Sequence, residues 1–269
     1  MSATDVADAG GAVDPGGFYE RRGEDRFGAT LHTQGPWDPS AAHGGPPSAL
    51  LGRAIEQTAP RDGFHVARLT VEILGPIPVD GEMVVKADVV RPGRSVELVE
   101  AELAAGGRAV ARARAWRIRG SAVPLPERGL RPPPNRPADA TTIDWPGGYI
   151  ASIEWRFGTG TFNQPGPATV WTRARRPLVT GEVLSPLQRV LLVADSGNGV
   201  SGELDLARYW FINPELTVHV YRLPAGEWVC LQARTAVAPD GIGLAESILF
   251  DDRGSLGRGA QALMLGPRG

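Results

Sequence analysis

The tripeptide Leu69-Thr70-Val71 recurs later in the chain as Leu216-Thr217-Val218, at an offset of 147 residues (216 − 69). A second repeated pair, Gly81-Glu82 and Gly226-Glu227, follows in the same order at an offset of 145 residues (226 − 81). Each Gly-Glu pair comes after a turn that contains proline and before an apolar run, as at the start of a strand. Two similar offsets in one order indicate that one structural unit is duplicated. A period this long excludes a solenoid and predicts two copies, each the size of a domain.

Each copy is predicted to contain one helix followed by a run of strands. In the first copy, apolar residues recur at helical spacing over residues 46–58. In the second copy, Ser185 and Pro186 suit the cap and first turn of a helix, and Gly197 and Gly199 are expected to end it. Strands are expected over residues 66–73, 82–90, 95–104 and 109–118, over 151–158 and 169–178, and over 215–221, 227–236, 243–250 and 256–265. This order predicts an antiparallel α+β fold rather than alternating βαβ units.

A proline-rich segment separates the two copies. Prolines stand at positions 124, 126, 132, 133, 134 and 137, and this density disfavours regular structure. We therefore expect a mobile N-terminal tail (1–17), an N-terminal repeat (18–119), a proline-rich linker (120–149) and a C-terminal repeat (150–269). The tail has neither a basic start nor a continuous apolar run, so we expect it to be neither a signal peptide nor a membrane anchor.

The composition limits the classes of partner and cofactor. The 269 residues carry a net charge of −2, which gives no electrostatic reason to expect nucleic acid or an anionic membrane as a partner. No stretch approaches the roughly 20 apolar residues that span a bilayer. The single cysteine, Cys230, permits no internal disulfide and fits a reducing compartment, so we expect a cytoplasmic protein. Neither a metal nor a cofactor is predicted, because the four histidines show no spacing typical of metal ligands: His32, His43, His65 and His219.

Several motifs then occur in a characteristic order. His43-Gly44-Gly45-Pro46-Pro47 precedes the first helix, and Asp195 stands at the end of the second. Asn-Pro-Glu-Leu-Thr-Val-His follows at 213–219, then Gly226-Glu227-Trp228 and, in the last strand, Gln261. Over about residues 27–265, apart from the linker, this order and spacing resemble the acyl-CoA thioesterase II (TesB-like) family. The resemblance implies a double hot-dog fold, in which each repeat wraps an antiparallel sheet around a central helix and the two sheets join. It also implies hydrolysis of an acyl-CoA by a water that an Asp, a Thr or Ser and a Gln hold, with neither a metal nor a covalent acyl-enzyme.

Asp195 and Gln261 are the first catalytic candidates from the residues themselves. Asp195 continues the apolar stripe of its helix, so its carboxylate is expected on a buried face, where a charge costs free energy unless it is paired. It also lies near the helix C-terminus, where the macrodipole disfavours a negative charge by roughly 0.3–1 kcal/mol. Gln261 shares its strand face with Gly257 and Gly259, which leave room for a ligand. We expect Asp195 to act as a general base on water and Gln261 to hold that water or stabilise the oxyanion. A helix-capping Asp and a Gln on a solvated strand are the alternatives.

The third catalytic position departs from the family pattern. Asn213 stands where the family has Thr or Ser; its amide can hydrogen-bond a water, but it has no hydroxyl. Thr217, at the start of the following strand, is the other candidate. An Asn-Pro turn and an ordinary strand threonine are the structural alternatives. In the first copy, the position of Gln261 corresponds to Arg114 or Ala115, so that copy is expected to lack the Asp–Gln pair.

His43, Gly44 and Gly45 are candidates for substrate binding. They precede a helix N-terminus, where free backbone N–H groups could polarise a thioester carbonyl or hold a phosphate. A tight loop that needs glycine is the structural alternative. Asp38 and His43 are five residues apart, which resembles the spacing in hot-dog hydratases, although Ser40 stands where such an enzyme has an asparagine.

The sequence thus predicts a thioester hydrolase that acts on an acyl-CoA. A non-catalytic acyl-binding protein of the same fold, and a hydratase that uses Asp38 and His43, are the alternatives, because fold alone does not separate them. The sequence contains neither a G-x-S-x-G elbow nor a P-loop motif, which argues against a serine α/β-hydrolase and a P-loop nucleotide-binding fold. Two paired repeats leave long strand edges that another copy could cover, so we expect a homodimer or a higher homo-oligomer.

Overall fold

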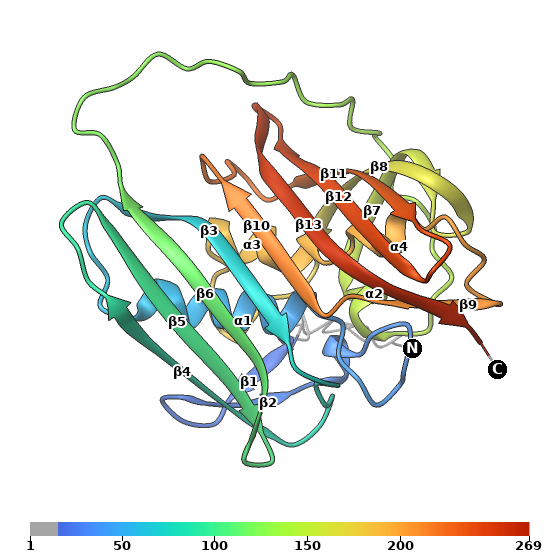
Figure 1. Cartoon of the computed structure of the whole chain (residues 1–269), viewed down its shortest axis with the longest axis horizontal. Coiled ribbons are helices and arrows are strands. Elements are labelled where there is room, and N and C mark those ends of the chain that lie inside the picture. The colour runs from blue at the N-terminus through green and yellow to red at the C-terminus, as the bar shows by residue number, and fades with distance from the viewer. Residues whose placement is uncertain (1–15, 269) are drawn as a thin grey trace, which may run out of the picture.

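One large antiparallel sheet and a few helices make up residues 16–268, the part of the chain that this computed structural model describes (Figure 1). The N-terminal half contains β1 (Tyr19–Arg21), β2 (Arg26–Ala29), the 3-10 helix η1 (Leu31–Thr33), α1 (Gly45–Gln57), β3 (Phe64–Ile73), β4 (Glu82–Arg91), β5 (Val96–Ala105) and β6 (Arg108–Arg119). The C-terminal half contains α2 (Gly148–Ser152), β7 (Ile153–Thr161), β8 (Gln164–Ala174), α3 (Pro186–Ala194), α4 (Gly197–Val200), β9 (Tyr209–Ile212), β10 (Glu215–Val220), β11 (Val229–Val237), β12 (Ile242–Asp251) and β13 (Gly254–Pro267). The ten predicted strands and the two predicted helices are confirmed to within five residues, whereas β1, β2, β9, η1, α2 and α4 were not predicted. Gly197 and Gly199, which were expected to end the second helix, lie in α4, and α3 ends before them at Ala194.

The sheet contains 13 strands in the order β1-β2-β4-β5-β6-β3-β10-β13-β12-β11-β8-β7, and β9 pairs with β13. The ladders between these strands are antiparallel. The order of β4-β5-β6-β3 in the first half is mirrored by β10-β13-β12-β11 in the second half. The predicted duplication is therefore visible in the topology, and the two copies meet where β3 pairs with β10.

The repeated tripeptides lie opposite one another at this junction. Thr70 of β3 pairs with Thr217 of β10, and the leucine that precedes each threonine faces the valine that follows the other. The two threonine hydroxyls are hydrogen-bonded at 3.1 Å. This reciprocal register means that a local two-fold axis passes between Thr70 and Thr217.

Helices α1 and α3 pack against each other behind the sheet (Figure 1). The Leu191 side chain of α3 packs directly against Gly52 of α1, where a Cβ atom would lie 2.3 Å from Leu191 Cδ1. The start of α3 is fixed by a capping box, in which the Ser185 hydroxyl accepts from the Gln188 N–H and the Gln188 side chain accepts from the Ser185 N–H. Leu50, Leu51 and Ile55 of α1 are fully buried, and α1 packs against strands β3 to β6. Burial of each such side chain contributes about 1.5–3 kcal/mol. No helix within residues 16–268 combines the length and the apolar character that crossing a membrane requires.

The segments before and after the first copy form hydrogen bonds with the second copy. Residues 1–15 of the expected tail lie outside the described residues, but Gly17 donates its N–H to Thr180 Oγ1 at 2.8 Å. The proline-rich segment runs without regular structure up to Gly148, where α2 begins inside the expected linker. Along its course, the backbone of Arg131 exchanges two 2.9 Å hydrogen bonds with Ser255, at the start of β13.

Candidate active site

Asp195 lies where the end of α3 meets the beginning of α1. It is the C-cap residue of α3 and only 4% exposed. Its carboxylate lies against Gly44, the N-cap of α1, since a Cβ atom at Gly44 would be 2.6 Å from Asp195 Oδ2. The negative charge is unfavourable at the C-terminus of its own helix, but the positive end of the α1 dipole faces it. The neighbouring helix therefore offsets the electrostatic cost expected from the sequence.

Two side-chain amides hold one oxygen of this carboxylate. Asp195 Oδ1 accepts hydrogen bonds from Asn213 Nδ2 at 2.8 Å and from Gln261 Nε2 at 3.0 Å. Gln261 Nε2 also donates to the Asp195 backbone carbonyl, and Gln261 Oε1 accepts the Asn198 N–H at 3.1 Å. These partners use both ends of the Gln261 amide, which is only 1% exposed. The arrangement fixes Oδ1 and directs Oδ2 toward the N-terminus of α1.

His43 faces the second oxygen. Its Nδ1 lies 3.4 Å from Asp195 Oδ2 and 3.0 Å from the Gly45 nitrogen, which donates its N–H to Nδ1. Burial lowers the pKa of His43, and the neighbouring Asp195 carboxylate opposes that shift. The imidazole is therefore neutral near pH 7, and while Nδ1 accepts from Gly45 the ring proton is on Nε2.

Tyr149 completes the cluster and was not predicted from the sequence. Its ring stacks on His43 with centroids 3.7 Å apart and an interplanar angle of 8°. Its hydroxyl donates to the Leu192 carbonyl at 3.0 Å and accepts from Ser196 Oγ at 2.8 Å. Burial raises the pKa of Tyr149, so the phenol stays protonated. Sequence reasoning assigned this residue to the linker, and a single tyrosine after two glycines carries no signal of such a contact.

The two glycines before α1 are needed for close packing rather than for a special backbone angle. Their φ values do not lie in the left-handed region. A Cβ atom at Gly45 would lie 2.1 Å from the Leu192 carbonyl oxygen, while one at Gly44 would meet Asp195. The expected cradle of free N–H groups is wrong for the first turn: the Gly45 N–H is bonded to His43, and Pro46 and Pro47 have none.

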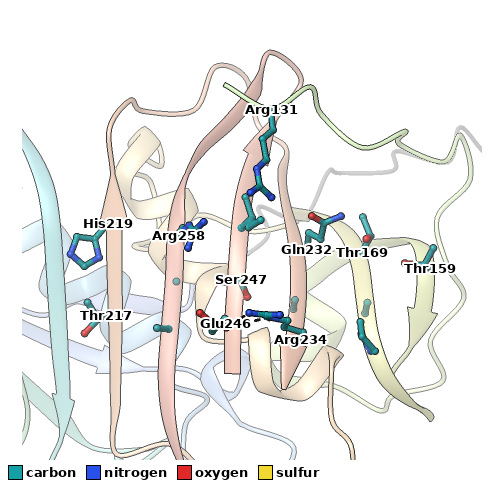
Figure 2. A pocket seen from close by; sticks show the side chains of 16 residues that line it. Arg131, Thr159, Thr169, Thr217, His219, Gln232, Arg234, Glu246, Ser247 and Arg258 are labelled. Atoms are coloured by element: carbon teal, nitrogen blue, oxygen red, sulfur yellow. Dashed lines mark hydrogen bonds and ion pairs between the residues drawn. The ribbon is translucent and has the colours of Figure 1, made fainter. Parts of the chain in front are cut away.

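Thr217 does not join this cluster. Leu216 and Val218 are buried on the side of the sheet that faces the helices, so alternation directs Thr217 to the outer side. There its hydroxyl is bonded to Thr70 and to Glu215 Oε2 (2.9 Å), beside a cavity of about 760 Å³ (Figure 2). The structure therefore brings together Asp195, Asn213 and Gln261, and the prediction that Thr217 belongs with them is wrong.

The residues of the hydratase alternative do not form a pair. Asp38 is exposed, and its Oδ1 accepts hydrogen bonds from the N–H and the hydroxyl of Ser40 at 2.8 and 2.7 Å. These hydrogen bonds lower the pKa of Asp38. The carboxylate beside His43 is that of Asp195 instead. The chemistry of a His–Asp38 dyad is thus not assembled here.

The first copy has different chemistry at the equivalent place. Thr70 pairs with Arg114 as Thr217 pairs with Ala260, so the residue equivalent to Gln261 is Ala115, which is fully buried. Two residues further along β6, Arg117 is buried and forms an ion pair of 2.6 Å with Glu97. Arg117 also donates to backbone carbonyls at the end of α1, including that of Thr58 at 2.8 Å. The first copy thus has a structural ion pair and no Asp–Gln pair.

No metal-ligand cluster or reactive thiol accompanies the site in the described part of the chain. Residues 16–268 contain no group of three or more His, Cys, Asp or Glu side chains arranged to hold a metal ion. Cys230 of β11 is fully buried in a cluster with Trp171 and Phe250, and burial raises the pKa of its thiol. The carboxylate, the two amides and the imidazole are therefore the groups available for chemistry in this cluster.

Comparisons with known proteins agree with this fold. Family models match residues 33–118 as an acyl-CoA thioesterase N-terminal domain and residues 128–265 as an acyl-CoA thioesterase C-terminal domain. A comparison with curated proteins gives no match.

Three solved structures illustrate the structural likeness. A Thermobifida fusca YX protein described as a thioesterase II has a TM-score of 0.72 and 20% identity, over 92% of this chain and 95% of that one. A protein with a hot dog fold from Alicyclobacillus acidocaldarius has a TM-score of 0.72 and 17% identity, over 91% and 95% of the two chains. The acyl-CoA thioesterase II TesB2 from Mycobacterium marinum has a TM-score of 0.66 and 14% identity, over 93% and 95%. Identities this low show the fold alone, but the C-terminal family model by itself spans more than half of the chain. The chain therefore belongs to the acyl-CoA thioesterase family.

Proposed function

We propose that the protein hydrolyses acyl-CoA thioesters at Asp195, with Asn213 and Gln261 holding the carboxylate in place. The observation that carries this proposal is the asymmetric environment of the carboxylate. Oδ1 accepts two amide N–H groups, whereas Oδ2 faces the N-terminus of α1 and the imidazole of His43. An oxygen held this way can accept a proton from a water molecule without rotating away.

The reaction is a direct hydrolysis. The water oxygen forms a bond to the thioester carbonyl carbon while its proton passes to Asp195 Oδ2. The tetrahedral intermediate then collapses as its C–S bond breaks, and the proton goes from Asp195 to the departing sulfur. The products are a carboxylic acid and a free thiol, and the carboxylate is regenerated.

The other residues of the cluster position these groups. Gln261 and Asn213 leave Oδ1 unavailable as a base, so the proton goes to Oδ2. His43 is neutral, and its Nε2–H is a donor that can stabilise negative charge on the thioester oxygen. Tyr149, stacked on the ring, fixes its plane. His43, Gly44 and Gly45 thus serve as one wall of the substrate site.

A non-catalytic acyl-binding protein is the second candidate. Two observations favour it: Asn213 offers no hydroxyl where the resemblance expects Thr or Ser, and Asp195 is only 4% exposed. A protein of this kind would bind a thioester in the same place without turning it over.

The deciding experiment measures thiol release from short, medium and long acyl-CoAs and from an acylated carrier-protein arm. Wild type is compared with Asp195→Asn, and with Asp240→Asn as a control on an exposed carboxylate. We expect kcat to fall by about 10²–10⁴-fold in Asp195→Asn and to be unchanged in Asp240→Asn. Thermal stabilisation by acyl-CoA with no thiol release from the wild type would instead support the binding protein.

A further inference from the structure

A second cavity lies beside the polar cluster, on the side of α4. Its volume is about 470 Å³, which is within the range of roughly 300–1,000 Å³ for small-molecule sites. The turn between β7 and β8, helix α4, the loop after it and strand β9 form its walls. The mechanism above uses none of the residues that line this cavity.

The cavity and the cluster share their supporting elements. Gly199 lines the cavity and directly follows Asn198, whose N–H holds Gln261. Phe211 lines the cavity from β9, two residues before Asn213, which holds Asp195. The cavity is therefore lined by residues that lie one and two positions along the chain from Asn198 and Asn213, which contact Gln261 and Asp195.

An apolar cluster continues from Gln261 toward the same cavity. Leu263 follows Gln261 on the same face of β13, and Leu263 and Phe211 belong to one buried cluster. Trp37, from the loop that leads to His43, packs edge-on against Phe211 with ring centroids 4.7 Å apart. A ligand that extends from Asp195 along this path would first contact the side-chain amides and then the aliphatic and aromatic side chains of this cluster.

The lining of the cavity suits a hydrocarbon rather than a phosphate. The partly or fully buried side chains that line it are apolar, namely Phe162, Leu204, Leu206 and Phe211, whereas the polar Asn163 and Gln164 are exposed. Asp205 is the one charged residue among those that line it, and it is exposed. No arginine or lysine of the described residues lines the cavity, so a nucleotide or pantetheine phosphate would find a like charge and no cation.

We propose that this cavity takes the acyl chain of the thioester and that Gly199 sets how long a chain it admits. The inference rests on the function proposed above and names its substrate class, thioesters of medium-length apolar acids. A Cβ atom at Gly199 would meet no atom within 4 Å, so its missing side chain is space left in the cavity wall. The backbone there is not in the left-handed region, so larger residues fit without strain.

The test compares Gly199→Leu with wild type on propanoyl-, hexanoyl- and decanoyl-CoA. For the wild type, kcat/KM should rise by up to about fourfold per methylene until the cavity is filled. The ratio of kcat/KM for decanoyl- over propanoyl-CoA should fall at least about tenfold in Gly199→Leu, because two to three methylenes lose their place. Leu204→Trp, which fills the cavity from another wall, should lower the same ratio and serves if Gly199→Leu does not fold.

Gly75→Leu is the matched control, since a Cβ atom there also meets nothing within 4 Å and Gly75 lies in the loop after β3, outside the residues that line the cavity. It should keep the wild-type ratio. Folded, active variants at Gly199 and Leu204 whose ratios stay within twofold of the wild type would overturn the acyl-chain assignment. If the wild type releases no thiol from any substrate, the hydrolase proposal fails. The cavity is then tested separately by the thermal shift that decanoate induces in wild type and in Gly199→Leu. An equal thermal shift in wild type and in Gly199→Leu, or no shift in the wild type, would reject the acyl-chain assignment of the cavity.

Discussion

Gln261 grips Asp195 at two points: its Nε2 lies 3.0 Å from the carboxylate Oδ1 and 3.0 Å from the backbone carbonyl oxygen of the same residue. Both the carboxylate and the backbone carbonyl of Asp195 are therefore bonded to Gln261. Rotation of the Asp195 side chain would break the hydrogen bond that joins its carboxylate to β13. Because the other end of the amide accepts the Asn198 N–H, the strand also fixes α4. The last strand of the chain thus sets the position of the carboxylate.

Gln261→Leu should impair both activity and stability. It leaves the buried Asn198 N–H without its acceptor, which costs about 1–3 kcal/mol, and it frees Asp195 to move. We expect a Tm lower by several degrees and a kcat lower by about 10²-fold. Gln232→Leu, on the exposed outer side of the same sheet, is the control and should change neither value. A wild-type kcat in Gln261→Leu would contradict the role given to the amide.

Variants of Asn213 test whether its side-chain amide takes the role of the Thr or Ser hydroxyl that the family pattern has at this position. In Asn213→Leu, one of the two donors to Asp195 Oδ1 is lost, and kcat should fall by about tenfold or more. Asn213→Thr restores a donor of the family type and should keep kcat within about fivefold of wild type. Thiol release at saturating acyl-CoA measures both variants. Equal activity of Asn213→Leu and wild type would show that the contact with Asp195 has no part in turnover.

Gly44→Ala should be damaging although the change adds a single methyl group. Its Cβ would lie 2.6 Å from Asp195 Oδ2, so either the carboxylate or the start of α1 must shift. Overpacking of this kind costs about 1–3 kcal/mol, and the displaced base should lower kcat by at least about tenfold. Thermal unfolding and thiol release measure the two effects. Gly75→Ala is the control, and a Gly44→Ala protein that matches it in both respects would refute the close contact.

The free energy of unfolding should decrease as the pH is lowered below about 6.5, because His43 is then protonated more readily in the unfolded chain. Burial lowers the pKa of His43 in the folded protein relative to its ordinary value of 6.5, so the unfolded chain binds that proton more readily. The contribution of the neutral ring is therefore complete above pH 6.5 and is lost as the pH falls from 6.5 toward the lowered pKa, by at most about 1.4 kcal/mol per pH unit.

Thermal unfolding at pH 5 to 8 measures this dependence. His43→Gln should lose less stability than the wild type over the acidic part of the range, because it has no proton to take up. His65→Gln, at an exposed histidine, should follow the wild type. Identical slopes for wild type and His43→Gln would show that this histidine is not held neutral by the fold.

Thr217→Val should leave catalysis intact. The change removes a hydroxyl that is bonded to Thr70 and Glu215 on the outer side of the sheet, away from Asp195. We expect kcat/KM within twofold of the wild type and a loss of at most about 1.5 kcal/mol in unfolding free energy. A loss of activity comparable with that of Asn213→Leu would place this hydroxyl back in the mechanism.

The sequence predicted the longer elements well because their signals are local. Alternating apolar residues mark strands of nine residues or more, and the repeated tripeptides place β3 and β10 at equivalent points of the two copies. The strands that were not predicted, such as β1 (Tyr19–Arg21) and β9, have only three or four residues, so alternation has too few residues to show. They form because a neighbouring strand edge supplies hydrogen bonds, which is a tertiary effect.

The candidate site was predictable where a residue conflicts with its local surroundings. Asp195 interrupts an apolar stripe at the wrong end of a helix dipole, and Gln261 interrupts a buried strand face. Thr217 was misplaced although alternation with Leu216 and Val218, both buried, already directs it to the other side of the sheet. Tyr149 could not be predicted, because its stacking on His43 joins segments more than a hundred residues apart and depends on the tertiary fold.

The Thr70–Thr217 pairing has a consequence for assembly. Reciprocal contacts of this kind are those that two identical subunits make in a symmetric dimer, and such a dimer comes apart on dilution. Here a peptide chain tethers both partners, so the loop that bears His43 and the helix end that bears Asp195 meet at any protein concentration. Tethering also allows each copy to mutate separately, and the two copies now differ at equivalent positions, with Ala115 in the first and Gln261 in the second.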